Sequence, residues 1–352
     1  MKHIIKEGKA KILASTGKIT AKMDVFYNPI MKLNRDISIL LLNSTKKKNL
    51  RIADPLAASG VRSIRFLLET KKVGSVAIND NSEKAVNAII QNLKLSNIDL
   101  NKVEVYNKDA NLFLLETIGN FDYIDIDPFG SPNYFLDAAV KKIARDGVLA
   151  ITATDTSALA GSFPYACKRK YWAKPLRNEE MHEIGLRIII RKIQLIAGQY
   201  EKVLIPVFSF SMEHYYRIFF KCIKGKSIVN EVIESHGTYK EAGPMWLGKL
   251  WDEKIVYSMH KCFEKNKHDF ENKREVEDLL KIIKEECKIN TVGFYDTHKL
   301  CNENKTSKIL KRDLIISTIK SKGYKAARTH LSWTGIRTDA PINKLKQIVI
   351  KL

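Results

Sequence analysis

Short runs of β-forming residues alternate with helical segments between about residues 50 and 220, and this alternation constrains the fold most. In the helical segments, apolar residues recur every three or four positions, which is typical of amphipathic helices. Strands that alternate with helices predict βαβ units, because parallel neighbours in a sheet need a crossover connection. We therefore expect a doubly wound α/β domain with a mostly parallel sheet.

The sequence places seven strands in this sheet, at residues 50–53, 75–79, 103–106, 121–125, 147–152, 203–210 and 215–223. Helices are predicted at residues 61–69, 82–95, 111–117, 132–143 and 179–199. The last two strands follow each other closely, so they can pair in antiparallel orientation. The expected sheet is seven-stranded and Rossmann-like.

The sequence pattern changes after about residue 250, where alternating strands and helices give way mainly to helices. Residues 254–265, 274–288 and 307–322 have the pattern of charged amphipathic helices. A length of 352 residues also favours two domains of about 150 residues each. We expect a first domain over residues 1–250 and a second, mainly helical α+β domain over residues 251–352.

The chain carries a large excess of positive charge. It has 60 Lys and Arg against 39 Asp and Glu, for a net charge of +21, and its last 48 residues alone hold twelve Lys and Arg against two acids. Such an excess favours a polyanionic partner, either nucleic acid or an acidic membrane surface. The most apolar stretch, residues 37–42, is far below the ~20 residues of a membrane span, and the N-terminus has no signal-peptide core. A cytoplasmic protein without a membrane partner is therefore expected.

The five cysteines give no sign of a disulfide framework or a zinc site. Their number is odd, they are widely spaced and none forms a C-x-x-C pair. We expect them to be reduced and mostly buried. His298 and Cys301 could share one face of a helix, but two isolated ligands are far more often packing residues than a metal site. No metal is expected.

Acidic residues follow the first four predicted strands. Ligands of an open α/β sheet bind at the carboxyl ends of its strands, so these positions point to a site. Asp54 precedes a turn of small residues, PLAASG, and Asp80 lies about twenty residues further on, where an acid can bind both hydroxyls of a ribose. Asp109-Ala110 follows the third strand and Asp127 the fourth. Such a series of acids suits an adenosyl ligand with a cationic centre better than one with phosphates.

A nicotinamide dinucleotide site is the alternative for this half of the chain. It also needs a glycine turn with an acid about twenty residues later. Here only Gly60 is present, where the G-x-G-x-x-G pattern has three glycines. The turn therefore does not provide for the close approach of a pyrophosphate to the backbone.

The segment Asp127-Pro128-Phe129-Gly130 gives the sharpest chemical signal. It has the form used to methylate the exocyclic amines of bases, whose lone pair is delocalised until acceptors hold the N–H groups. Asp127 and the Pro128 carbonyl could be those acceptors, and Phe129 offers a face on which a base stacks. The alternative is a plain strand-to-helix turn with Asp127 as a cap, because all these residues are turn formers.

Several further stretches match one known family. They read EGKAKI, VFYNPIMKLNRDIS, ADPLAASGVRSIRF, IDIDPFGSP, ITATDTSAL, CKRKYWAKPLRNEEMHEIGLRI, GPMWLGKL and YKAARTHLSWTGIRTDAP. On these motifs, which span nearly the whole chain, the sequence resembles the tRNA (guanine(26)-N(2))-dimethyltransferases. DPFGSP and NRD together are specific to this family.

The resemblance implies a class I methyltransferase fold with S-adenosyl-L-methionine as the methyl donor. The implied products are N2-methyl- and then N2,N2-dimethylguanosine at position 26 of tRNA, and the C-terminal domain is implied to help hold the tRNA. Longer members of the family carry extra C-terminal basic or cysteine-containing segments, so this chain resembles the compact form, and no protein partner is implied. One departure is PLAASG, where related sequences often have Ser and Thr, so one hydroxyl contact to the donor is lost.

Carried over by motif, the resemblance makes Arg35 of NRD and Arg65 of GVRSIRF donor-binding residues. A guanidinium can bind the methionine carboxylate through two hydrogen bonds. Arg62 is the alternative to Arg65, and either arginine could instead be a surface residue of its helix. The resemblance also implies that Asp54 lies at the methionine amine and that Asp80 contacts the ribose. Asp109 and the Ala110 amide are implied to contact the adenine.

Phe26 of VFYNP is implied to face the target base together with Phe129. Our hypothesis is that the guanosine turns out of its stack into the pocket and is clamped by the two rings. Asp127 and the Pro128 carbonyl then hold the amine in line with the sulfonium methyl, so that most of the rate comes from positioning.

Two basic segments are candidates for the tRNA surface. Residues 164–177, expected as a loop, interleave basic and aromatic side chains, which suits phosphate contact and stacking on unpaired bases; these are Lys168, Arg169, Lys170, Lys174 and Arg177 with Tyr165, Tyr171 and Trp172. The alternative is a solvated loop whose aromatic residues pack underneath. The second candidate is the terminal segment with Lys320, Lys322, Lys325, Arg328, His330, Trp333 and Arg337.

Two other functions compete with this interpretation. One is a non-catalytic RNA-binding module with a degenerate donor site, which has no reason to keep Asp80, Asp109 and Asp127. The other is a methyltransferase of adenine N6 or cytosine N4 in RNA or DNA. Such enzymes typically carry an aromatic residue one place later, as in Asn-Pro-Pro-Tyr, whereas Phe129 follows Pro128 directly.

Overall fold

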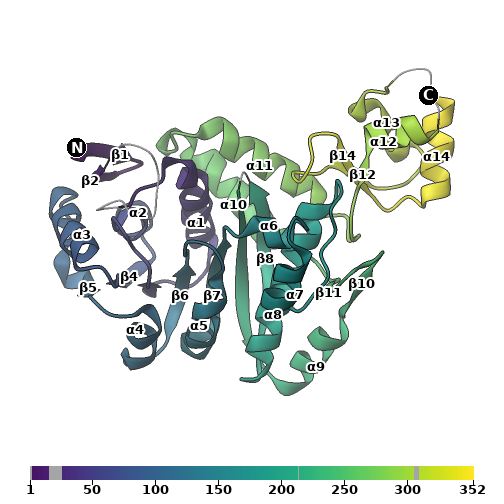
Figure 1. The fold of residues 1–352 in the computed structure, drawn as a ribbon. Coiled ribbons are helices and arrows are strands. Elements are labelled where there is room, and N and C mark those ends of the chain that lie inside the picture. The colour runs from purple at the N-terminus through teal and green to yellow at the C-terminus, as the bar shows by residue number, and fades with distance from the viewer. Residues whose placement is uncertain (1, 16–25, 213, 305–308) are drawn as a thin grey trace.

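A computed structural model describes residues 2–15, 26–212, 214–304 and 309–352. A seven-stranded sheet runs through the molecule (Figure 1), and its strands in chain order are β3 (Leu50–Asp54), β4 (Val73–Asn79), β5 (Val103–Tyr106), β6 (Phe121–Ile126), β7 (Ile143–Ala153), β8 (Lys202–Met212) and β9 (Tyr215–Lys224). Their order across the sheet is β5-β4-β3-β6-β7-β9-β8. The first five strands in this order, β5, β4, β3, β6 and β7, are parallel to one another. Strand β9 is antiparallel to both of its neighbours, β7 and β8. The doubly wound sheet and its antiparallel last pair are confirmed.

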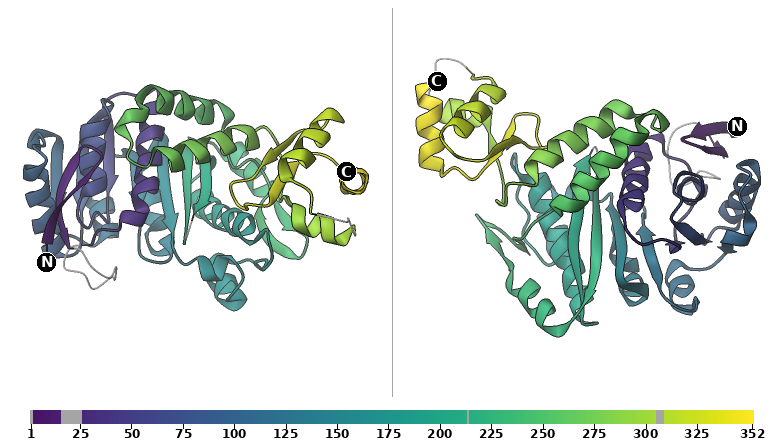
Figure 2. Two further views of the ribbon diagram at one scale, coloured as in Figure 1. Left: turned by 90° about the horizontal axis from the view of Figure 1, so that it is seen from above. Right: turned by 180° about the vertical axis from the view of Figure 1, so that it is seen from behind.

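Helices cover both faces of the sheet (Figure 2). One face carries α1 (Lys32–Ser44), α2 (Val61–Glu69), α3 (Glu83–Leu95), α10 (Glu253–Asn266) and α11 (Lys273–Glu286). The other carries α4 (Ala110–Glu116), α5 (Leu136–Lys142) and α8 (Met181–Gly198). Strands enclosed in this way are apolar along their length. In β6, FDYIDI, every residue except Asp122 is buried, so Asp125 is a buried charge that needs partners.

Shorter elements surround this core. The N-terminal hairpin of β1 (Lys2–Glu7) and β2 (Ala10–Ser15) packs on α2 and α3. The other short elements before residue 250 are η1 (Pro29–Met31), η2 (Leu100–Lys102), η3 (Pro132–Phe135), α6 (Thr156–Leu159), α7 (Pro164–Tyr171), α9 (Lys226–Glu234), β10 (His236–Tyr239) and β11 (Ala242–Trp246).

The C-terminal part projects from one corner of the molecule (Figure 1). After η4 (Lys267–Asp269) and α11, it consists of β12 (Tyr295–Asp296), α12 (Thr297–Glu303), α13 (Arg312–Ser321), β13 (Ala326–Arg328), β14 (Gly335–Thr338) and α14 (Ile342–Lys351). The three strands form a small sheet in the order β12-β14-β13. Residues 295–352 are called the C-terminal subdomain below.

Apolar packing divides the chain into two cores. Side chains of α10 and α11, such as Val256, Phe263 and Leu280, belong to the main core and pack beside α1. A second, smaller core lies within the C-terminal subdomain, around Ile315, Ile336 and other buried residues of α12, α13 and α14. The break between the two cores therefore falls near residue 295.

Two segments differ locally from the expectation. Residues 164–177 were expected as a loop, but α7 occupies their first half, because Cys167 and Tyr171 lie one turn apart and are both buried. The helix expected over residues 307–322 begins at Arg312, and residues 307 and 308 lie outside the described residues. Within the described ranges, no helix is long and apolar enough to cross a membrane.

Candidate active site

The acids that follow β4 and β5 lie at one edge of the sheet. Asp80 accepts the backbone N–H of Ala58 at 2.8 Å and that of Ser82 at 3.0 Å. Because Ala58 belongs to the turn after β3, Asp80 ties two strand ends together. That turn ends at Gly60 with φ of 75°, and a Cβ there would lie 3.2 Å from Ile89, so glycine is strongly favoured.

Asp109 follows β5, next to β4 in the sheet. Its carboxylate caps α4 by accepting the backbone N–H groups of Asn111 at 2.9 Å and Leu112 at 3.2 Å. Ala110, the first residue of this helix, is buried. A carboxylate has about four acceptor positions, so Asp80 and Asp109 keep capacity for the hydroxyl and amino groups of an adenosine.

Asp54, at the end of β3, is a buried acid. It is 2% exposed and accepts a hydrogen bond from the hydroxyl of Ser63 at 2.7 Å. Burial raises the pKa of Asp54 to about 7, and the nearby Asp125 and Asp127 act in the same direction, against the opposing effect of Arg62. This carboxyl therefore titrates near neutral pH and favours a cation beside it.

Arg62 connects the turn after β3 with the strand end that carries Asp127. Its guanidinium donates to Asn34 Oδ1 at 3.0 Å, lies 3.3 Å from Asp125 and donates to the Asp127 carboxylate. Asp125 is also held by Arg217 of β9, at 2.9 Å and 2.6 Å. Asp125 and Arg217 are both fully buried. The structure thus brings Asp54, Arg62 and Asp127 into one charged cluster.

Arg35 and Arg65 share one carboxylate, that of Glu7 in β1. Arg35 donates to it at 2.7 Å and 2.6 Å, and Arg65 at 2.8 Å. Arg65 is 1% exposed and also pairs with Asp36 and Glu69, so its guanidinium is enclosed by acids. Although burial alone would raise the pKa of Glu7, Arg35 and Arg65 hold it at about 2. The two arginines are therefore placed by Glu7 rather than left on a helix surface.

The aromatic pair expected at the target base is in contact. The rings of Phe26 and Phe129 meet edge to face, with centroids 4.5 Å apart and an interplanar angle of 76°. Phe129 is 60% exposed, whereas Pro128 is buried. The Asp127 side chain is 18% exposed, so it is accessible from the same edge. Asp127 and the two rings therefore define an open apolar corner beside a carboxylate.

Residues 127–132, here called the DPFGSP loop, are held from two sides. Gly130, at φ of 83°, donates its N–H to the hydroxyl of Thr154 at 2.6 Å and accepts the Thr154 N–H at 2.9 Å. On the other side, the hydroxyls of Ser131 and Tyr171 are 2.9 Å apart, and Tyr171 donates to Asp155 at 2.7 Å. The loop is thereby connected to the end of β7 and to α7.

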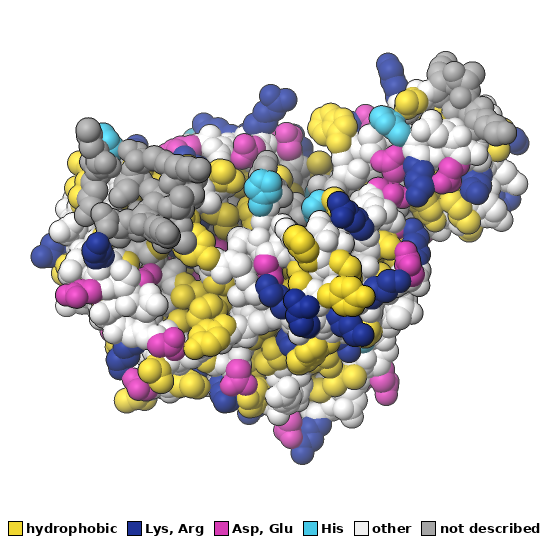
Figure 3. All heavy atoms as spheres, in the orientation of Figure 1, with side chains coloured by type: hydrophobic (Ala, Val, Ile, Leu, Met, Phe, Trp, Pro, Cys, Tyr) yellow, Lys and Arg dark blue, Asp and Glu magenta, His cyan; other side chains and the backbone are white. Residues whose placement is uncertain are grey.

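Helix α7 presents its basic residues outward. Lys168, Arg169 and Lys170 are exposed, and Tyr165 is 78% exposed, whereas Tyr171 packs underneath. Lys and Arg side chains gather over α7 and the neighbouring α8 and β11 on the face seen in Figure 3. Further along, Lys174, Arg177 and Trp172 are also exposed. This surface retains free cations, since only Lys170 and Lys174 of these are paired, with Asp155 and Glu241.

The second basic segment contains one clear correction. Arg337 was expected to contact tRNA, but it is fully buried and pairs with Glu183 of α8 at 2.6 Å and Glu286 of α11 at 3.0 Å. Two buried acids, one on α8 and one on α11, require this cation, so Arg337 joins the C-terminal subdomain to the main core. His330 is likewise enclosed, 2.7 Å from Glu286. Arg328, in contrast, is half-exposed and pairs with Asp313.

Sequence reasoning missed several residues that organise the site. Arg217 stands in the apolar strand YYRIFF, and a lone cation in such a run is a signal for a buried acid elsewhere. Asp125, two residues before Asp127, is that acid. Glu7 had no such signal, because its partners are far away in the sequence. Among the described residues, no three or more His, Cys, Asp or Glu side chains are arranged to hold a metal ion.

Known proteins resemble this chain over nearly its whole length. The sequence matches the family described as "N2,N2-dimethylguanosine tRNA methyltransferase" over residues 3–241 and 235–350. It is 38% identical to a tRNA (guanine(26)-N(2)/guanine(27)-N(2))-dimethyltransferase of Aquifex aeolicus, over 96% of this chain and 93% of that protein. It is 39% identical to a tRNA (guanine(26)-N(2))-dimethyltransferase of Pyrococcus horikoshii, over 96% and 95%.

A solved structure has the same fold along the whole chain. Trm1 from Pyrococcus horikoshii with S-adenosyl-L-methionine superposes with a TM-score of 0.90 at 37% identity, and the match covers 99% of each chain. The agreement thus extends over the sheet, its helices and the C-terminal subdomain. This chain belongs to the N2,N2-dimethylguanosine tRNA methyltransferase family.

Proposed function

We propose that this protein transfers methyl groups from S-adenosyl-L-methionine to the exocyclic N2 of guanosine 26 in tRNA, giving N2,N2-dimethylguanosine after two turnovers. Family membership over nearly the whole chain supports this activity. The observation that carries it is the DPFGSP loop. It places Asp127 and the ring of Phe129 at the carboxyl edge of the sheet, beside the acids of the donor half.

The residues present fit this donor, which supplies an electrophilic methyl group on a sulfonium when bound. Asp80 would hold the ribose, and Asp109 with the Ala110 amide would hold the adenine. Asp54 would face the methionine amine. Burial raises the pKa of Asp54 to about 7, and a cationic amine beside it would stabilise the carboxylate. Arg35, with Arg65 or Arg62, would hold the methionine carboxylate. Arg35 suits this role better than Arg65, because Arg65 already meets three carboxylates.

The acceptor guanine would enter at the corner formed by Phe26 and Phe129. A planar base does not fit between rings whose centroids are 4.5 Å apart, so base entry requires the two rings to separate. Once stacked there, the N2 amine would donate to Asp127 and to the Pro128 carbonyl. This arrangement turns the nitrogen lone pair toward the methyl group, and positioning supplies most of the rate. After transfer the nitrogen carries an extra proton, which Asp127 or water removes.

Two surfaces would hold the tRNA. The exposed cations Lys168, Arg169 and Arg177 lie on and beside α7, which contacts the DPFGSP loop through Tyr171. Arg328 lies on the C-terminal subdomain. We assign tRNA contact to residues 295–352 rather than to all of residues 251–352, because α10 and α11 pack into the main core.

Donor binding is expected to depend on pH through Asp54. Burial raises the pKa of Asp54 to about 7, so below that value the carboxyl is protonated and loses its attraction for the methionine ammonium. The affinity for S-adenosyl-L-methionine should therefore rise about tenfold or more between about pH 5.5 and pH 7.5, and then level off. Calorimetric titration measures this profile. Asp54→Asn should bind weakly at every pH, and an unchanged slope in that variant would remove Asp54 from the donor site.

Tyr171→Phe is expected to lower turnover by about three- to tenfold without changing donor affinity. The substitution removes the hydroxyl that joins Ser131 to Asp155, so the DPFGSP loop is held less firmly against the base. Steady-state kinetics at saturating tRNA checks this, and Tyr165→Phe on the exposed side of α7 is the matched control. Equal kcat values for the two variants would show that this contact does not position the loop.

The experiment that tests the proposed function uses unmodified tRNA transcripts and labelled S-adenosyl-L-methionine. Label should enter a transcript with guanosine 26 and be lost when adenosine replaces it. A transcript with guanosine at both 26 and 27 tests the wider specificity named for the Aquifex relative. Donor binding without label in any transcript would identify a different acceptor, and absent donor binding would leave the RNA-binding module as the explanation.

A further inference from the structure

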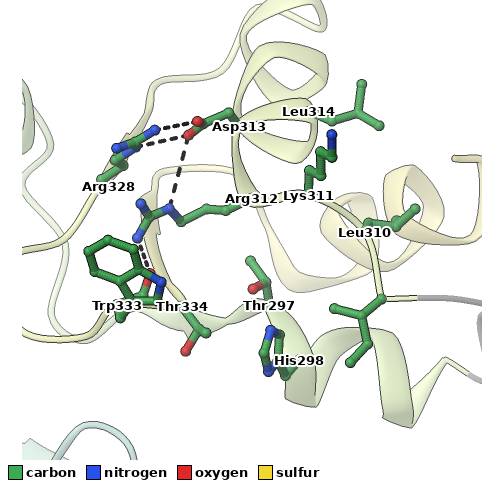
Figure 4. Close-up of a pocket in the computed structure, with 11 residues that line it drawn as sticks. Thr297, His298, Leu310, Lys311, Arg312, Asp313, Leu314, Arg328, Trp333 and Thr334 are labelled. Atoms are coloured by element: carbon green, nitrogen blue, oxygen red, sulfur yellow. Dashed lines mark hydrogen bonds and ion pairs between the residues drawn. The ribbon is translucent and has the colours of Figure 1, made fainter.

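A hollow outside the candidate active site lies in the C-terminal subdomain. It has a volume of ≈ 550 Å³ and is formed by α12, the start of α13 and the loop between β13 and β14 (Figure 4). Its lining combines apolar side chains, such as Leu310 and Trp333, with the charged side chains of Lys311, Arg312, Asp313 and Arg328.

Trp333 is the most unusual of these residues, because its side chain is 88% exposed. Tryptophan is enriched at interfaces, because its ring is apolar and its N–H is polar. The loop that carries the indole is nevertheless held by hydrogen bonds. The guanidinium of Arg312 lies 5.6 Å from the ring centroid and donates to the Trp333 carbonyl oxygen, and Gly335 donates its N–H to Ser332 at 3.2 Å within the same loop.

The hollow also carries net positive charge. Its lining includes three basic residues, Lys311, Arg312 and Arg328, and one acid, Asp313. Arg328 donates to both oxygens of the Asp313 carboxylate, through Nε and one terminal nitrogen. Arg312 reaches between the indole of Trp333 and the Asp313 carboxylate (Figure 4), with a nitrogen to oxygen distance of 4.0 Å to the acid. An anion is therefore the complementary ligand for the remaining charge.

We propose that this hollow binds an unpaired nucleotide of the tRNA, at a site remote from guanosine 26. The base stacks on the free face of Trp333, and the phosphates contact Lys311 and Arg328. Stacking on an exposed aromatic ring beside an arginine is the usual way in which proteins hold single-stranded nucleotides. The inference rests on the proposed function for its choice of RNA, and it assigns to this site the holding of the substrate, not its chemistry.

The test compares Trp333→Ala with Ile118→Ala, a residue of equal exposure (89%) after α4, on the main domain. Trp333→Ala should weaken binding of a tRNA transcript by about ten- to hundredfold and raise its KM by the same factor. The kcat at saturating tRNA and the affinity for S-adenosyl-L-methionine should stay unchanged. Trp333→Tyr, which keeps a stacking ring, should recover most of the affinity, and Ile118→Ala should bind as the wild type does.

Three further measurements separate stacking from simple charge attraction. A fully paired RNA duplex should bind wild type and Trp333→Ala equally, because it offers no unpaired base. Lys311→Ala should lower the slope of log affinity against log salt by about one. The tryptophan fluorescence of Trp333, measured as the difference in emission between wild type and Trp333→Tyr, should be quenched when tRNA binds.

The outcomes distinguish this inference from the proposed function. If Trp333→Ala binds tRNA within twofold of wild type while the wild type methylates guanosine 26, the inference is wrong and the function stands. If Trp333→Ala loses tRNA affinity but the wild type methylates no guanosine, the nucleotide site stands and the function is wrong. If Trp333→Ala loses affinity for the paired duplex as it does for tRNA, Trp333 contributes to RNA binding without stacking on an unpaired base. That result would overturn the stacking proposal.

Discussion

Asp127→Ala should lose methyl transfer by about 10²- to 10⁴-fold while keeping its affinity for both donor and tRNA. The carboxylate of Asp127 stands at the open corner beside Phe26 and Phe129, and its side chain is partly accessible. It is the group that would accept an N–H of the target amine. Without that acceptor the lone pair stays delocalised into the base, and the bound donor and acceptor do not react.

Single-turnover kinetics measures this effect directly, because both substrates are bound before the reaction starts. Asp127→Asn should retain part of the activity, since an amide oxygen still accepts a hydrogen bond. Asp137→Ala, at an exposed acid on α5, is the control for the loss of one carboxylate. A rate for Asp127→Ala within about threefold of wild type would exclude Asp127 from the mechanism.

Arg217→Met should destabilise the protein by about 3–5 kcal/mol. Arg217 and Asp125 are both fully buried, and Arg217 also donates to the hydroxyls of Thr152 and Ser38 at 2.9 Å. Removing the guanidinium leaves a buried carboxylate with Arg62 as its remaining cation, at 3.3 Å. The cost is that of an incompletely compensated charge in the core.

Urea unfolding measures this loss, with Arg145→Met as the control because the Arg145 side chain is 73% exposed. The control should stay within about 0.5 kcal/mol of wild type. Adding Asp125→Asn to Arg217→Met should restore part of the stability, since an amide needs no counter-ion. A loss below about 1 kcal/mol in Arg217→Met would show that this pair does not stabilise the fold.

The sheet could be predicted because its determinants are local. Strands that are enclosed on both faces read as continuous apolar runs, and each predicted strand is found within a few residues of its position. The acids at the strand ends were found for the same reason, since chain order and strand direction place them at one edge. The start of β7 at Ile143 was missed because its first residues include Arg145 and Asp146, which are exposed.

Only the site residues that belong to recognisable motifs could be predicted from the sequence. The resemblance implies that Arg35 and Arg65 bind the donor, but not that Glu7 places them both. Likewise, α7 was expected as a loop because its charges dominate its composition, whereas burial of Tyr171 on its inner side decides its conformation.

Arg337 shows why surface charge is hard to infer from sequence. Its segment is basic, and nothing local distinguishes it from Arg328 nearby. The difference lies in Glu286 and Glu183, which are 51 and 154 residues from Arg337 in the chain. Both acids become buried where α8, α11 and β14 meet. Such pairings are set by tertiary packing and leave no periodic signal.

Identification of the product nucleoside tests the central claim most directly. Purified protein is incubated with S-adenosyl-L-methionine and an unmodified transcript that has guanosine at position 26, and the RNA is digested and analysed by mass spectrometry over time. We expect N2-methylguanosine first and N2,N2-dimethylguanosine later, both absent from a transcript with adenosine 26. N6-methyladenosine, N4-methylcytidine or guanosine methylated at another atom would contradict this expectation.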